Sequence, residues 1–228
     1  MFTCTQRRFN PLYVDLAERL KDFDKVASFN ATYTLNIPTR ATGWRCLTED
    51  CGGGVVIDLG YHIIDQLIWW FGYPDDIYCK SSDISDGSYD TEDSATIAFS
   101  YHSGLHGSII LSRCSGKRRE EYQIASRDLS VEGNKSELVI SMRETGEKTL
   151  EKRGDFSEVS TDAQLDFFLQ TLANGEDFKE NVHDNLLNMK FIEQSYRGKL
   201  TKDQVLFVET YMKRTPPPER KGGLSHGL

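Results

Sequence analysis

Two hydrophobic periods run along the chain, and they predict two kinds of element. Residues 27–37 alternate apolar and polar positions, which is typical of a half-exposed strand, and residues 2–9 have strand-like composition. The segment after Pro11 spaces leucines among charges as an amphipathic helix does, with Asn10 as N-cap and proline at the first helical position. A loop is expected over residues 38–53.

Strand signals dominate the middle of the chain. Turn chemistry at Tyr101–Leu105 and Glu132–Lys135 marks hairpin connections, and short links between successive strands favour antiparallel pairing. The sequence therefore predicts one large, mostly antiparallel sheet. Its expected strands lie at about 76–82, 94–101, 105–113, 120–126, 128–132 and 137–142.

Helical periodicity returns at residues 162–172 and again at 183–196, with Asn174-Gly175 as a natural stop between them. The first of these helices places its apolar residues on one face, at Leu165, Phe168, Leu169 and Leu172. A terminal helix is expected at 202–212. The prediction is an α+β domain over residues 1–213, an open-faced sheet with helices packed on one side, followed by a disordered tail at 214–228.

The segment from Gly52 to Gly72 is an apolar helix that nevertheless carries three ionisable groups. At about 100° per residue, Asp58, His62 and Asp65 fall within about 60° of one another. Apolar residues fill most of the remaining circumference, so this helix should be buried on most sides. A buried carboxylate or imidazole needs a partner, so the stripe must face an internal network or a wet cleft.

Composition narrows the class of protein. A formal net charge of -8 argues against a nucleic-acid partner or an anionic membrane surface. The five cysteines show no CxxC spacing, and no apolar run is long enough to span a bilayer, so a cytoplasmic protein with reduced thiols is expected.

The spacing of Asp58 and His62 suits acid/base chemistry, because a carboxylate can orient an imidazole whose pKa of about 6.5 lies near working pH. The same residues could instead satisfy helix ends or a core network. A metal site built on Asp58, His62 and Asp65 is a third alternative, but no further ligand is signalled nearby and no metal is expected.

Four further side chains could reach such a cleft. Arg7, Arg8 and Arg45 offer rigid donor forks, and Trp44 offers a flat apolar surface suited to a sugar ring. On a strand, Arg7 and Arg8 would point to opposite faces, so at most one of them would face a common site. Trp44 could equally be an anchor for its loop.

Taken together, RRFNP at 7–11, the loop with GWR and the string GGGxxxDxGxHxxD at 52–65 resemble the C-terminal domain of the Gfo/Idh/MocA oxidoreductases. The resemblance implies an enzyme in which a separate Rossmann domain holds NAD or NADP. It assigns His62 and Asp58 to catalysis. It also counts Arg8 and Asp65 with the substrate site, Arg8 as a substrate- or cofactor-facing residue and Asp65 as the acid that orients its neighbours.

No GxGxxG follows a strand in this sequence, and the family's Glu-Lys-Pro segment is missing. The resemblance therefore implies that the chain is the substrate-binding and oligomerisation domain of an enzyme acting on a sugar, a polyol or a related hydroxy compound. As a truncated part of that enzyme, the chain alone is expected to be inactive and to bind no NAD(P). The alternative is a non-catalytic ligand-binding or assembly module. A homo-oligomer through the open sheet face is expected, because a large uncovered apolar face is rarely tolerated.

Overall fold

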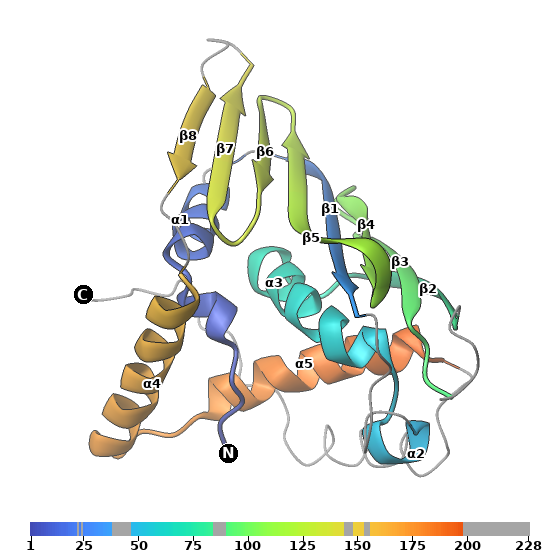
Figure 1. Ribbon diagram of the computed structural model, residues 1–228. Helices are drawn as coiled ribbons and strands as arrows, with labels where there is room; N and C mark the ends of the chain where they lie inside the picture. The colour runs from blue at the N-terminus through green and yellow to red at the C-terminus, as the bar shows by residue number, and fades with distance from the viewer. Residues whose placement is uncertain are drawn as a thin grey trace.

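An eight-stranded sheet carries the helices of this α+β protein on one of its faces, as expected (Figure 1). The computed structural model describes residues 1–21, 23, 25–37, 47–83, 90–143, 148–152 and 156–197. The predicted positions Trp44 and Arg45, the terminal helix at 202–212 and the tail lie outside these residues.

The sheet is antiparallel except for one central parallel pair, β1 with β4, and its strand order is β2-β3-β4-β1-β5-β6-β7-β8. The six segments expected as strands are confirmed, with β5 longer than expected. Strand β8 lies in a polar segment that showed no strand signal. The strands are β1 Val26–Asn36, β2 Asp76–Ser82, β3 Ser94–Ser100, β4 His106–Ser112, β5 Cys114–Ser126, β6 Leu129–Gly133, β7 Glu137–Met142 and β8 Lys148–Lys152.

Helix α1 begins as predicted, because the Asn10 side chain accepts a hydrogen bond from the backbone N–H of Leu12 at 2.9 Å and Pro11 follows it. Helices α4 and α5 both begin earlier than expected. The helical segments are η1 Gln6–Phe9, α1 Pro11–Leu20, α2 Thr48–Cys51, η3 Val56–Gly60, α3 Tyr61–Phe71, α4 Ser157–Ala173 and α5 Lys179–Ser195.

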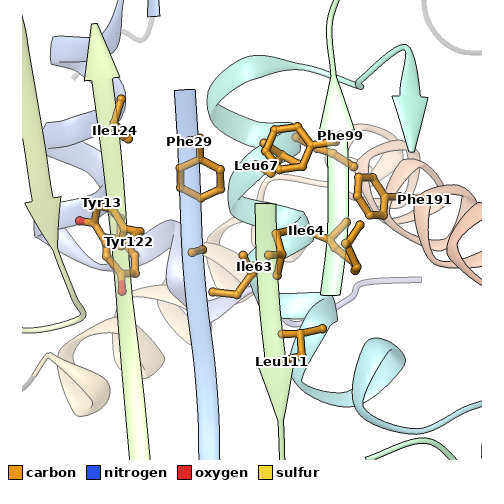
Figure 2. Packing of buried hydrophobic residues seen from close by; sticks show 14 of the residues in the cluster. Tyr13, Phe29, Ile63, Ile64, Leu67, Phe99, Leu111, Tyr122, Ile124 and Phe191 are labelled. Atoms are coloured by element: carbon orange, nitrogen blue, oxygen red, sulfur yellow. The ribbon is translucent and has the colours of Figure 1, made fainter. Parts of the chain in front are cut away.

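The core lies between the sheet and α3, where alternate strand residues meet the apolar side of the helix (Figure 2). Phe29 on β1 is 1% exposed, and Ile64 and Leu67 on α3 are fully buried. Because α3 also packs against α5, it is enclosed on most sides, as its composition predicts. This enclosure places its few polar residues at defined exits from the core.

The strand expected at residues 2–9 is wrong: Gln6–Phe9 form a 3₁₀ turn instead. In this turn Arg7 and Arg8 both reach helix α3, where Arg7 bonds Gln66 and Arg8 bonds Asp65. The pleating argument for opposite faces therefore does not apply here, and of the two arginines only Arg7 lines the cavity beside His62. These tertiary ion pairs and hydrogen bonds outweigh local strand propensity.

Helix α4 does not bury the apolar face that its periodicity predicts. Leu165, Leu169 and Leu172 are each more than half exposed, and only Phe168 finds aromatic partners, in Phe2 and Phe178. A periodic pattern identifies the helix but not what covers it.

The outward face of the sheet is less apolar than expected. Its central positions are polar residues such as Asn30, Thr32 and Ser108, with Ile110 at 44% and Tyr78 at 68% exposure as large apolar exceptions. A wholly apolar open face, the reason given for oligomerisation, is therefore not present among the described strands.

Candidate active site

His62, in the first turn of α3, lines a hollow of about 200 Å³. Helix α3 provides this imidazole, while η1, the start of α1, β1, β5, the β6–β7 turn and the first turns of α4 provide the other walls. The lining residues are Gln6, Arg7, Asn10, Tyr13, Tyr33, His62, Arg118, Glu120, Lys135, Ser157, Ser160 and Thr161. Among these, His62 is the residue whose ordinary pKa suits proton transfer near neutral pH.

Arg7 and Glu120 form an ion pair within the lining of the hollow. The Nη2 atom of Arg7 lies 2.7 Å from Oε1 of Glu120, and both side chains are nearly buried. Nη1 of Arg7 donates to Oε1 of Gln66 at 2.7 Å, and its guanidinium lies 5.0 Å from the centre of the Tyr33 ring. With three partners, this guanidinium is held in one position beside His62.

Burial, and after it the positive charge of Arg7, lower the pKa of His62 from 6.5 to about 4. Asp58 and Asp65 act in the opposite direction but do not compensate. The half-buried imidazole is therefore neutral at neutral pH and has a nitrogen able to accept a proton.

Asp58 stands one helical turn before His62, in the π-helical segment η3, and pairs with Arg113 after β4. The Nη2 atom of Arg113 lies 3.0 Å from Oδ2 of Asp58. The Arg113 side chain is 7% exposed and the Asp58 side chain 37% exposed, so the carboxylate remains open to water. The sequence did not single out Arg113.

Asp65 faces a different, internal network. Oδ1 of Asp65 accepts from Nη2 of Arg8 and from Nδ2 of Asn188, each at 2.7 Å, and its side chain is 3% exposed. Arg8 also pairs with Asp184 on α5. Burial alone would lower the pKa of Arg8, but these carboxylates raise it. Arg8 and Asp65 therefore join η1, α3 and α5 in the structure.

The glycine turn before α3 is shaped by Glu92. Its carboxylate accepts the backbone N–H groups of Gly54 at 2.9 Å and Val56 at 3.0 Å, and it receives the Tyr196 hydroxyl. A Cβ on Gly54 would lie 1.9 Å from the Glu92 carbonyl oxygen, so glycine is needed for this approach. A carboxylate thus occupies the place where a phosphate would meet these amides.

The stripe predicted on this helix is thus divided between two environments. His62 lines the hollow and Asp58, which does not line it, is open to water beside Arg113, whereas Asp65 pairs with Arg8 inside the protein. Sequence reasoning missed Glu120, although strand alternation places it on the same face as the buried Tyr122.

Within the described residues, no group of three or more His, Cys, Asp or Glu side chains could hold a metal ion. The described part of the chain also contains no helix that is both long enough and apolar enough to cross a membrane.

Comparison with known proteins agrees with this architecture. Residues 20–138, more than half of the chain, match the GFO/IDH/MocA C-terminal domain. The chain therefore belongs to the Gfo/Idh/MocA family of oxidoreductases, as its C-terminal domain. No curated protein matches the chain.

Solved oxidoreductases share the fold at low sequence identity. A levoglucosan dehydrogenase in complex with NADH and levoglucosan is 18% identical with a TM-score of 0.69, over 85% of this chain and 63% of that one. An oxidoreductase from Thermotoga maritima is 19% identical with a TM-score of 0.72, and the match covers 86% of this chain and 59% of that one.

A 3-ketoreductase from Actinomadura kijaniata, in complex with TDP-benzene and NADP, is 14% identical with a TM-score of 0.71, over 87% of this chain and 61% of that one. This chain thus spans less than two thirds of the length of these structures. At such identities the likeness establishes the fold alone.

Proposed function

We propose that this chain is the substrate-binding and oligomerisation domain of an NAD(P)-dependent oxidoreductase that acts on a sugar, polyol or related hydroxy compound. The observation that carries the proposal is the neutral imidazole of His62 at the wall of a water-accessible hollow. In this role His62 accepts the proton of a substrate hydroxyl, and Asp58, one turn away, stabilises the imidazolium that results.

The described residues do not fit a dinucleotide. The glycine turn directs its amides at the Glu92 carboxylate, which would repel a pyrophosphate. We therefore assign cofactor binding to a separate Rossmann domain, and the proposed chemistry of this chain is restricted to binding the substrate and moving its proton.

The remaining expected site residues fall into two groups. Arg8 and Asp65 support the site indirectly in this proposal, because their mutual ion pair holds η1, and with it Arg7, against α3. Trp44 and Arg45, which lie outside the described residues, are proposed as substrate contacts.

The experiment follows the histidine rings of the labelled chain by NMR while D-glucose or myo-inositol is added. We expect the His62 resonances to shift in a saturable way, and we expect that signal to be identified by its loss in His62→Gln. His106→Gln, at an exposed position on β4, is the matched control. Saturable binding that leaves His62 unmoved would contradict the proposed site.

A further inference from the structure

Arg113 follows the last residue of β4, and its backbone is held on both sides. Its N–H donates to the carbonyl of Asp93 at 2.9 Å, and its own carbonyl accepts from the N–H of Ile37 at 3.0 Å. These two bonds tie Arg113 to residues that flank β3 and β1. The side chain that leaves this anchored backbone is 7% exposed. The guanidinium is therefore a buried cation at a fixed place, and not a mobile surface charge.

The partner of this cation is a carboxylate with more access to water. The Nη2 atom of Arg113 lies 3.0 Å from Oδ2 of Asp58, whose side chain is 37% exposed. A carboxylate with this exposure could adopt several rotamers, because water satisfies it in each of them. An ion pair with a buried guanidinium selects one. The other carboxylate next to Arg113 is that of Asp93, which is fully buried and accepts from Sγ of Cys114 at 3.4 Å.

Asp58 lies one turn before His62, at a place where the helix is irregular. Residues Val56–Gly60 form the π-helical segment η3, and α3 begins directly after it. Such π-helical turns are rare and are frequent at functional sites. Segment η3 packs against β4, which brings Asp58 within reach of Arg113. Asp58 is thus held from the sheet while it belongs to the helix that carries the proposed base.

The charges around His62 come from several elements. Burial is the main cause of its low pKa, and the charge of Arg7 on η1 lowers the pKa as well. The charges of Asp58 and Asp65 raise it. The other charged side chains that line the hollow with His62 are Glu120, Arg118 and Lys135. Arg113 does not line the hollow, so we expect its influence on His62 to pass through Asp58.

We propose that Arg113 is a positioning residue of this site, which fixes the orientation of the Asp58 carboxylate and compensates part of its charge, so that His62 stays a neutral base. This inference rests on the proposed function and adds a residue to it. An uncompensated Asp58 would favour the imidazolium, and a protonated His62 cannot accept a proton. When His62 takes the proton of a substrate hydroxyl, a carboxylate already fixed one turn away stabilises the new charge without reorganising.

The test is a double-mutant cycle of the parent, Arg113→Gln, Asp58→Asn and the double variant. The readout is the pKa of His62, followed by NMR through its ring resonances between about pH 3.5 and about pH 8. We expect Arg113→Gln to raise this pKa by about 0.5 unit or more, because the Asp58 charge is no longer compensated. Asp58→Asn should cancel the rise, so that the double variant and Asp58→Asn have the same pKa at His62.

Three further variants complete the test. Arg119→Gln is the matched control, because it removes the same charge from an exposed β5 position that pairs with Glu121, and the pKa of His62 should not change. Arg113→Lys keeps a positive charge and should restore most of the parent value, which a merely steric role of the arginine does not predict. Arg113→Met, with an apolar side chain that suits a buried position, replaces Arg113→Gln should that variant not fold.

Two results would overturn the inference. An unchanged pKa of His62 in both Arg113→Gln and Arg113→Met would show that Arg113 does not control the charge of Asp58. An equal rise with and without the Asp58 carboxylate would show that Arg113 acts on the imidazole directly. Neither measurement involves a sugar, so the proposed function would still be decided by the response of His62 to D-glucose or myo-inositol.

Discussion

The Nη2 atom of Arg8 lies 2.7 Å from Oδ1 of Asp65, although the two residues are 57 positions apart. Their side chains are 18% and 3% exposed. The pair fixes the 3₁₀ turn η1 against α3, and the adjacent Arg7 is thereby placed beside His62. A structural ion pair thus supports the geometry of the candidate site.

Removing Arg8 should destabilise the protein strongly. Arg8→Ala leaves the Asp65 carboxylate buried without its cation, and we expect a loss of about 3 kcal/mol in the free energy of unfolding, measured by urea denaturation. Arg19→Ala, in an exposed i,i+4 pair with Asp15, is the control and should cost less than about 1 kcal/mol. Equal effects of the two variants would contradict this role of the buried pair.

Gly54 should tolerate no side chain. In Gly54→Ala the new Cβ would meet the Glu92 carbonyl oxygen at 1.9 Å, so the turn or the Glu92 loop must move and the cap of η3 and α3 is weakened. We expect a loss of at least about 2 kcal/mol in the free energy of unfolding. Gly116→Ala, where a Cβ meets nothing within 4 Å, should be close to neutral. A stable Gly54→Ala protein would disprove the steric argument.

The low pKa of His62 predicts a specific loss of stability in acid. Burial and Arg7 lower this pKa from 6.5 to about 4, so between these values the unfolded chain binds a proton at this position that the folded chain does not. The free energy of unfolding should therefore fall as pH decreases from 6.5 towards 4. Above pH 6.5, His62 should not contribute to the dependence of the free energy of unfolding on pH.

Urea titrations from pH 4.5 to pH 7.5 measure this contribution. His62→Gln should show a weaker dependence on pH over that range than the parent protein. His106→Gln should follow the parent, because that side chain is exposed on β4. If the free energy of unfolding depends on pH in the same way in the parent and in His62→Gln, the imidazole has the same pKa in the folded and unfolded chains and the prediction is wrong.

The proposed oligomer can be located with two surface variants. Ile110 stands on the open sheet face at 44% exposure, and Leu165 stands on α4 at 53% exposure. If copies associate through the open sheet face, Ile110→Glu should weaken the dimer at least tenfold in sedimentation experiments, whereas Leu165→Glu should not. Sedimentation of the parent as a monomer at all concentrations would argue against the proposal, and dissociation by Leu165→Glu alone would move the interface to α4.

NADH should not bind to this chain alone. The amides of Gly54 and Val56 are occupied by the Glu92 carboxylate, whose negative charge would also repel a pyrophosphate. Titration followed by NADH fluorescence should show no saturable change, and added D-glucose should not alter that result. Tight, saturable binding would refute the assignment of the cofactor to a separate domain.

Local sequence determined much of this architecture. Alternation identified β1, turn chemistry between short strand-like segments identified β2 to β7, and Asn10-Pro11 marked the start of α1, because turns and helix caps depend on near neighbours. The string from Gly52 to Asp65, together with RRFNP and GWR, indicated the family that the comparison confirms.

Tertiary structure decided the environment of each polar group. The sequence placed Asp58, His62 and Asp65 on one stripe, but only the fold paired Asp65 with Arg8 inside the protein and left Asp58 beside Arg113 in contact with water. The pKa of His62 was likewise set by burial and by Arg7. Desolvation and ion pairing depend on distances between residues far apart in the chain, and no local pattern contains those distances.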